Sequence, residues 1–283
     1  MFLSKVKSIF LLIGLIIGIT VFGAWQQETV FASSSISTIQ TTSKLSAINI
    51  TSHSDHSNIL SGKDTIVHDS RSKSVQQEIT TIKWHMSQEY IDGYFRFAFY
   101  VDEIVGDPLY ALDIQLDYYH TSAPSDPFEF TQLPTISKVG LVTTGLVGST
   151  DVIASTTFWA VGGVYLAEAA DGSAYTKDIP IGDVELQNKI GQDFPIYIDP
   201  LSTLNAANIR TDWVKTGSIA WNGRPQYINW YNATYGVQTD DWWSAREIRH
   251  IQPREYGGQN VNENLMPIPI LEHSLISKWF INY

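Results

Sequence analysis

Alternation of apolar and polar residues marks the middle of the chain as a β-sheet region. Leu112, Ile114 and Leu116 alternate with polar residues, which is the pattern of a strand with one buried face. Further strand-like runs, separated by turns rich in glycine, proline and aspartate, cover residues 94–101, 138–147, 152–166 and 194–198. Many strands with little helical periodicity predict an antiparallel β-sandwich-like domain over residues 76–204.

The pattern near the C-terminus is different and predicts a small α+β unit. Residues 247–251 and 265–268 fit two short strands. Gly257 and Gly258 lie in the loop between them, where glycine supplies positive φ freely. Pro269 suits the first turn of a helix that we expect to end near the C-terminus.

This strand–loop–strand–helix order is a ββα unit. It brings His250 on the first strand near His273 on the helix. We expect residues 205–283 to form one small domain, since they hold six of the nine tryptophans. The helix residues expected to face inward are Ile270, Leu271, Leu275 and Phe280.

The first residues have the order of an export signal. Two lysines precede an uncharged apolar run over residues 9–23, and Ala32 suits a cleavage site. Because the run is shorter than the roughly 20 residues that span a bilayer, we expect a signal peptide over residues 1–32. The alternatives are a cut near Gly23 and an uncleaved anchor. The mature protein is predicted to be secreted, without stable membrane association after cleavage.

A Ser/Thr-rich stretch without aromatic residues covers residues 33–75. Such a segment buries too little apolar surface to offset the entropy of ordering the chain. We expect a disordered linker, in which the histidines are solvated rather than bound to metal.

Composition and charge narrow the functional classes. The chain has no cysteine, which excludes disulfides and Cys-ligated zinc. Its formal net charge of -11 argues against a coat protein for nucleic acid. Residues 76–204 carry 5 basic and 18 acidic side chains, whereas residues 205–283 carry 7 of each. Arg246, Arg249 and Arg254 still form a local basic cluster in the C-terminal region.

An ordered set of motifs lies in the same region. His-Ile-x-Pro begins at His250, Gly-Gly-x-Asn begins at Gly257, Asn-Leu begins at Asn264, and His273 follows. In this order and spacing, the segment resembles the HNH family of endonucleases, which have a ββα-metal finger. The Pro-Arg-Glu-Tyr-Gly-Gly run and the closing Trp-Phe-x-x-Tyr are similar to C-terminal nuclease domains of secreted bacterial polymorphic toxins.

The resemblance implies hydrolysis of phosphodiester bonds in DNA, with RNA as a second substrate, and a divalent ion such as Mg, Mn, Ni or Zn. It implies that His250 is the general base, a role that suits an imidazole with a pKa near neutrality. His273 would be a metal ligand. Asn264 would bind the metal, hold the finger in shape or orient the base.

The remaining residues of the expected site shape the loop or hold the substrate. Gly257 and Gly258 would shape the loop between the strands. Arg254 and Arg246 would contact phosphate groups.

One residue departs from the family pattern. Arg249 precedes the base, where the family usually has Asp or His as the first metal ligand. A guanidinium cannot ligate a metal and repels one. Three interpretations stay open: Arg249 holds the phosphate while other residues keep the metal, or the site binds metal weakly, or the finger is inactive. The candidate metal ligands in the first interpretation are His273, Asn264, Glu247 and Asp241.

Two functions follow. The first is a secreted, toxin-type endonuclease, for which the producing cell needs a protective immunity protein. The second is a secreted or surface-bound β-sandwich binding protein with an inactive finger.

Overall fold

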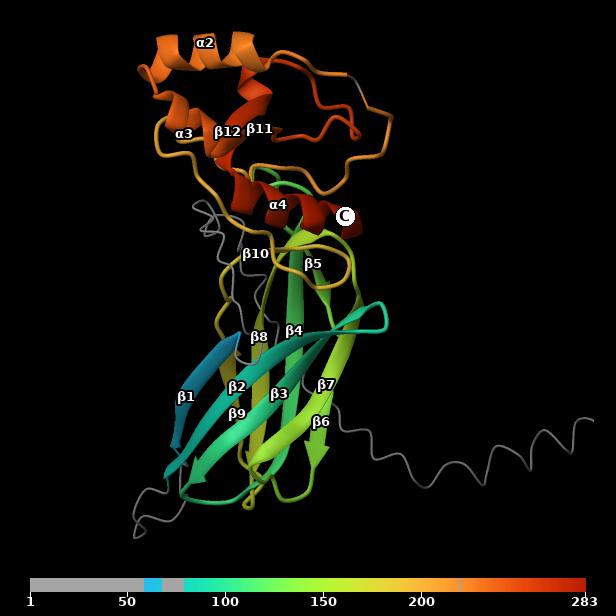
Figure 1. Ribbon diagram of the computed structural model, residues 1–283. Helices are drawn as coiled ribbons and strands as arrows, with labels where there is room; N and C mark the ends of the chain where they lie inside the picture. The colour runs from blue at the N-terminus through green and yellow to red at the C-terminus, as the bar shows by residue number, and fades with distance from the viewer. Residues whose placement is uncertain (1–58, 68–78, 219) are drawn as a thin grey trace, which may run out of the picture. The chain divides into compact units, whose positions relative to one another are not determined.

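The computed structural model describes residues 59–67, 79–218 and 220–283 (Figure 1). The predicted signal peptide and most of the predicted linker lie outside the described residues. The described residues belong to one compact unit. None of the described helices is long and apolar enough to cross a membrane.

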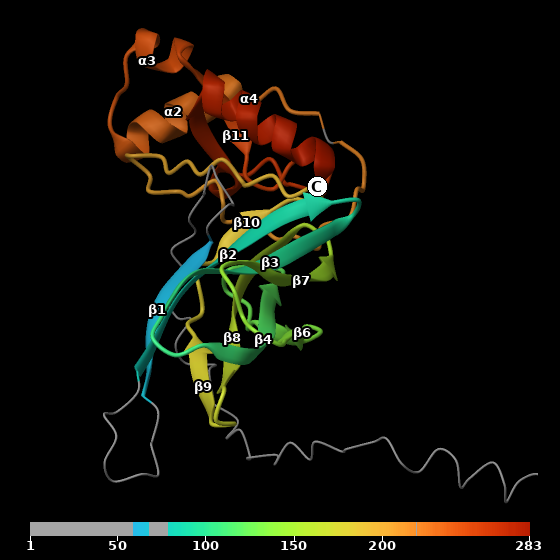
Figure 2. The ribbon, with the colours of Figure 1, turned by 90° about the horizontal axis from the view of Figure 1, so that it is seen from below.

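Two antiparallel sheets face each other in the first part of this unit (Figures 1 and 2). One sheet has the order β1-β2-β3-β7, with β1 Leu60–Val67, β2 Ile79–Ile91, β3 Tyr94–Val105 and β7 Gly145–Ile153. The other has the order β10-β8-β4-β5, with β6 paired to β4 and β9 paired to β8. Its strands are β4 Leu109–Thr121, β5 Glu129–Gln132, β6 Ile136–Val139, β8 Thr157–Ala169, β9 Ala174–Ile179 and β10 Glu185–Gln187.

The core between the sheets is built from alternate strand positions. Leu112, Ile114 and Leu116 of β4 are fully buried. They belong to one apolar cluster with aromatic side chains of the facing sheet, among them Trp84 and Phe99. The predicted alternation is therefore confirmed, and so is the predicted fold class, antiparallel β-structure followed by a small α+β region.

Three strand-like runs differ from the structure in detail. Residues 138–147 are divided between β6 and β7, because the chain turns at Gly140 and Gly145, both with positive φ. Residues 152–166 are likewise divided between β7 and β8. Residues 194–198 form no named strand, consistent with Pro195, which has no N–H to donate to a ladder.

The prediction of a disordered linker over residues 33–75 is wrong for strand β1. This strand pairs with β2 along its whole length. Its order comes from side chains across the sheets rather than from its own composition. The indole N–H of Trp84 and the hydroxyl of Tyr165 both donate to a carboxylate oxygen of Asp64, at 2.9 and 2.8 Å.

The C-terminal region contains the predicted ββα unit. Strand β11 (Arg246–His250) pairs antiparallel with β12 (Leu265–Pro269), and helix α4 (Ile270–Trp279) follows directly. The loop between the strands ends in a short 3-10 helix, η3 (Asn262–Asn264). A second 3-10 helix, η4 (Phe280–Asn282), follows α4. The element order agrees with the sequence prediction. The strands differ by one residue from the predicted ranges 247–251 and 265–268, and α4 ends at Trp279, before the predicted end near the C-terminus.

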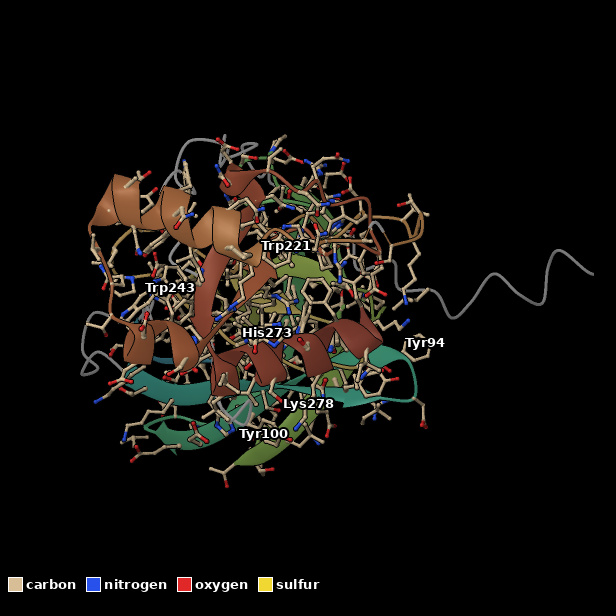
Figure 3. The ribbon with its side chains drawn as sticks, turned by 45° about the horizontal axis from the view of Figure 1, so that its top comes forward. Tyr94, Tyr100, Trp221, Trp243, His273 and Lys278 are labelled. Carbon is tan, nitrogen blue, oxygen red and sulfur yellow. The ribbon has the colours of Figure 1, made fainter. Side chains whose placement is uncertain are left out.

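Two further helices, α2 (Arg224–Tyr235) and α3 (Asp240–Ser244), precede β11. Tyr227 and Tyr231 of α2 pack with Trp243 of α3 in an aromatic core. Trp221 contacts the same core, and Figure 3 labels it together with Trp243. The expectation that the C-terminal tryptophans form a core is confirmed for this group.

A separate core crosses the predicted boundary between residues 204 and 205. Phe158, Leu186 and Phe194 of the sheet region share it with Trp279 and Phe280 at the C-terminus. The two regions therefore share buried apolar surface.

Helix α4 turns a different face inward from the one predicted. Ile276 and Trp279 are buried, and Phe280 is buried as predicted, whereas Ile270, Leu271 and Leu275 are exposed. Positions 276, 279 and 280 have the spacing of one helical stripe, and this stripe fills the shared core.

Candidate active site

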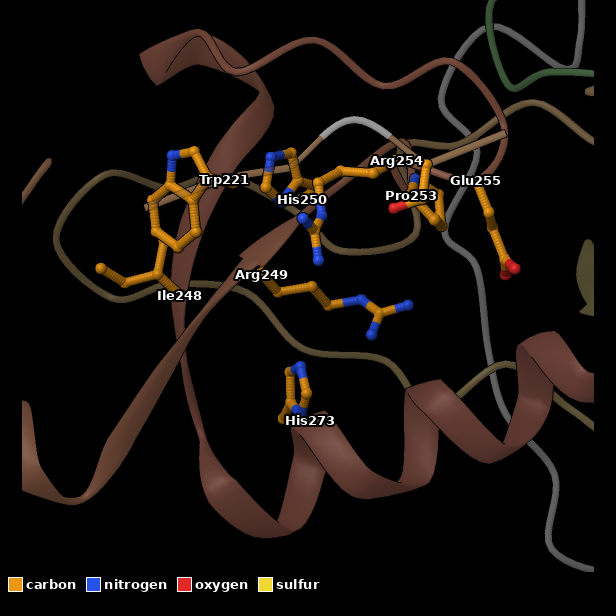
Figure 4. A pocket seen from close by; sticks show the side chains of 9 residues that line it. Trp221, Ile248, Arg249, His250, Pro253, Arg254, Glu255 and His273 are labelled. Atoms are coloured by element: carbon orange, nitrogen blue, oxygen red, sulfur yellow. The ribbon is translucent and has the colours of Figure 1, made fainter. Parts of the chain in front are cut away.

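One pocket of about 350 Å³ contains four of the predicted site residues. Arg249 and His250 come from β11, Arg254 from the following loop and His273 from α4. Figure 4 shows the Arg249 side chain crossing the space between the two imidazole rings. The other lining residues are Ser218, Trp221, Ile248, Pro253 and Glu255.

His250 is the last residue of β11 and is held in one orientation. Its Nε2 lies 2.8 Å from Oδ1 of Asn260, whose Nδ2 donates to the backbone oxygen of Ala220 at 3.1 Å. Because the amide nitrogen is used in that way, the amide oxygen faces the ring and accepts from Nε2–H. The edge of the ring meets Trp221 at 5.4 Å between centroids. In the neutral imidazole, Nδ1 is then the basic nitrogen.

The surroundings keep His250 neutral. Burial lowers its pKa, the hydrogen bond to Asn260 raises it, and the charges of Arg254 and Arg249 lower it further. The net direction is downward, so the ring is unprotonated at neutral pH.

Arg249 is buried beside the histidine, and 8% of its surface is exposed. One guanidinium nitrogen donates to Oγ of Ser277 at 3.0 Å. The guanidinium carbon lies 5.0 Å from the centre of the Phe280 ring. Burial lowers the pKa of Arg249 to about 10, against the opposing charge of Glu255, so the group remains a cation at neutral pH.

His273 lies in the first turns of α4 and points towards Arg249 (Figure 4). It is half-buried. Burial lowers its pKa, as does the charge of Arg249, while Glu247 raises it. The pocket therefore places a permanent cation beside two neutral imidazoles.

Asn264 does not line the pocket. Its Oδ1 accepts from the backbone N–H of Gln252 at 2.8 Å, and its Nδ2 donates to the backbone oxygens of Gln252 and Gln259. The side chain thus ties together the two ends of the loop. Of the three roles expected for it, these contacts favour the shaping of the finger.

Glycine is favoured at the two loop positions for different reasons. Gly257 has φ +83°, which favours glycine. At Gly258 a Cβ atom would lie 1.8 Å from the backbone oxygen of Gln252, so only glycine permits that approach. Both residues shape the loop, as predicted.

Of the two arginines predicted to contact phosphate, one lies at the pocket and the other does not. Arg254 lines the pocket. Arg246 does not; its guanidinium lies 3.9 Å from the centre of the Trp242 ring and donates to the backbone oxygen of Trp242.

Sequence reasoning gave no role to several residues of the site. Asn260 orients the base, Ser277 holds the guanidinium, and Trp221 and Glu255 line the pocket. Two of them lie in the sequence motifs: Asn260 closes the Gly-Gly-x-Asn motif, and Glu255 lies in the Pro-Arg-Glu-Tyr-Gly-Gly run. The others come from segments whose approach depends on the tertiary fold.

The donor set does not fit a divalent ion. Arg249 occupies the space between the two imidazoles, and a guanidinium repels a cation. Asn264, expected as a ligand, uses its amide within the loop. Among the described residues, no three His, Asp or Glu side chains are grouped to hold a metal ion.

Comparisons with known proteins give no family. No protein-family model matches the sequence, and neither does any curated protein. A solved structure, described as the X-ray structure of Northeast Structural Genomics Consortium target SoR45, aligns at 11% identity with a TM-score of 0.19. The alignment covers 44% of this chain and 85% of that chain.

Proposed function

We propose that this pocket cleaves phosphodiester bonds of nucleic acid, DNA or RNA. The observation that carries the proposal is the orientation of His250. The contact of Nε2 with Asn260 leaves Nδ1 as the basic nitrogen, in a pocket that also holds a buried guanidinium. A positioned base and a fixed cation are two of the elements that phosphodiester cleavage needs.

Each group has a defined task in this proposal. Nδ1 of His250 takes the proton of the attacking hydroxyl or water. Arg249 holds a phosphate oxygen, for which a planar guanidinium is well suited. Arg254, at the edge of the same pocket, holds the substrate.

The divalent ion implied by the sequence resemblance remains a separate prediction. Because the donor set does not fit it, no step of the proposed reaction passes through a metal. A metal series in the cleavage assay tests it directly.

We also propose that the protein is exported and acts as a toxin-type effector, with an immunity protein as its partner. The basic and apolar order of residues 1–32 supports export. The similarity of the C-terminal motifs to polymorphic toxins supports the toxin role. Co-expression with its neighbouring genes would test the partner: rescue of growth by one of their products is expected.

The test of the nuclease is cleavage by purified protein. Plasmid DNA and RNA are incubated with Mg, Mn, Ni or Zn, or with EDTA. His250→Ala is expected to abolish cleavage, while His85→Ala, on β2, keeps it. Equal cleavage by both variants would assign the activity to something other than this pocket.

A second function, a binding protein with an inactive finger, has one observation in its favour. The guanidinium of Arg249 already has partners within the chain, Ser277 and Phe280. In this alternative, Arg249 is a structural residue, and folded protein leaves DNA and RNA intact under every condition. Binding of residues in the β-region to cell-envelope fractions would then be measured.

A further inference from the structure

We propose that the substrate is RNA and that Arg249 takes the place of a divalent ion, so that cleavage uses the 2′-hydroxyl and needs no metal. This inference rests on the proposed phosphodiester cleavage and names its substrate class. It starts from the arrangement of the pocket, in which the side chain of Arg249 passes between two imidazoles (Figure 4).

The guanidinium can act on a phosphate because it is fixed in the pocket. It is buried, its pKa of about 10 keeps it charged, and Ser277 and Phe280 hold it from the side of α4 and η4. Among the described residues, the hydrogen bond of the guanidinium goes to a Ser hydroxyl, and the nearby carboxylate of Glu255 acts on it through its charge. An oxyanion is therefore the ligand that would neutralise it.

A reaction without a metal limits which group can act as the nucleophile. Without a metal, an external water is a weak nucleophile and must be captured and oriented. The 2′-hydroxyl of RNA is already attached beside its phosphorus, which gives it a high effective concentration. A positioned base can then activate this hydroxyl without a metal, whereas DNA has no such hydroxyl.

The two imidazoles transfer the protons of the reaction. Nδ1 of His250 takes the proton from O2′, and O2′ forms a bond to phosphorus while the P–O5′ bond breaks. The bound phosphate, an anion, raises the pKa of His273 and favours its imidazolium form, which gives a proton to the leaving O5′. The products are a 2′,3′-cyclic phosphate and a 5′-hydroxyl end, and one proton has passed from His273 to the product while His250 has gained one.

The two rings lie on either side of the Arg249 side chain, which carries the guanidinium at its end (Figure 4). His250 is on β11 and His273 on α4, with the Arg249 side chain crossing the space between them. A phosphate bound to Arg249 would therefore have one ring on the side of the attacking oxygen and the other on the side of the leaving oxygen.

The first experiment uses an RNA oligonucleotide, its DNA counterpart and its fully 2′-O-methylated counterpart, each with EDTA. We expect cleavage of the RNA alone, with 2′,3′-cyclic phosphate ends. Arg249→Met should lower the rate by at least about 100-fold, the usual effect of removing one donor to a developing charge. Arg249→Lys keeps the cation and should retain part of the activity. Arg96→Met, in the β-region, is the matched control and should cleave like the wild type.

A second measurement isolates the role of His273. His273→Asn should lose cleavage of RNA but keep most cleavage of uridine 3′-(p-nitrophenyl phosphate), whose leaving group needs no proton. Equal losses on both substrates would contradict the role as a general acid.

The outcomes separate this inference from the proposed function. Cleavage that requires a divalent ion, acts on DNA or leaves 5′-phosphate ends would overturn the RNA mechanism and leave the nuclease in place. Folded protein that cleaves none of the substrates under any condition would overturn both.

Discussion

Replacement of Arg249 by methionine separates a functional guanidinium from a structural one. Methionine keeps an unbranched apolar stem but removes the charge. If Arg249 serves the substrate, its removal should cost activity and little stability. If it serves the fold, its removal should cost several kcal/mol, as when one partner of a buried pair is deleted.

The structure gives the size of the expected effect. Burial lowers the pKa of Arg249 to about 10, and because one pKa unit corresponds to about 1.4 kcal/mol, the charged form is disfavoured by roughly 3 kcal/mol. Against this stand the hydrogen bond to Ser277 and the contact with the Phe280 ring. These interactions contribute about 1.5–3 and 0.5–1 kcal/mol. The two sides nearly cancel, so the free energy of unfolding should change by less than about 1 kcal/mol.

The assay is urea unfolding followed by tryptophan fluorescence, with the slope against urea compared between variants. Arg224→Met is the matched contrast, because Arg224 donates to the backbone oxygens of Trp243 and Arg246. Its loss leaves two acceptors without their donor, and a destabilisation of about 1–3 kcal/mol is expected. A loss above about 3 kcal/mol in Arg249→Met would refute the reasoning and favour the inactive finger.

Three further predictions concern the loop and the two imidazoles. Gly258→Ala places a Cβ 1.8 Å from a backbone oxygen. It should destabilise the protein to urea more than Gly172→Ala, where the side chain meets open space and only the φ of +79° is unfavourable for alanine; equal losses would contradict the close approach. Asn260→Asp puts a carboxylate against Nε2–H and should raise the pKa of His250 by about one or more in an NMR titration, whereas Asn260→Ala should lower it; identical titrations would exclude the contact. The folded state lowers the pKa of both His250 and His273, so it binds fewer protons than the unfolded chain, and their contribution to stability is present above about pH 6.5 and lost as the pH falls through the folded values. In the double variant with Gln at both positions, the urea midpoint should change less between pH 7.5 and 5 than in the wild type. An equal change would assign the pH dependence to other groups.

The β-region could be predicted from the sequence where a strand buries one face and exposes the other. Leu112, Ile114 and Leu116 alternate because one face of β4 packs against the opposite sheet. Strand β1 was missed because its order depends on Trp84 and Tyr165, which lie far away in sequence and hold Asp64. A local composition measure cannot detect such partners.

The site was predictable in topology but not in contacts. The order of motifs placed His250 and His273 on a strand and a helix that do meet. It did not separate Asn260, which contacts the base, from Asn264, which closes the loop. Both are asparagines in loop sequence, and only the fold decides which of them faces the ring.

The buried face of α4 was predicted wrongly for a related reason. Ile270 and Leu271 are as apolar as Ile276, so hydrophobicity alone leaves the buried face undecided. The choice is made by the partner surface, which comes from Phe158 and Phe194 of the β-region. A helix read apart from the sheets cannot show that surface.

This partner surface gives the β-region a part in the geometry of the pocket. The helix that carries His273 is fastened to the sheet region: Asn188 donates to the backbone oxygen of Trp279 at 3.1 Å, and the Trp279 indole donates to the backbone oxygen of Gln192 at 2.7 Å. Residues 205–283 alone would expose the buried stripe of α4, at about 1.5–3 kcal/mol for each large side chain. We therefore expect this fragment to show little cooperative unfolding by circular dichroism and no cleavage. A fragment that folds and cleaves like the whole protein would show that the finger needs no support from the sheets.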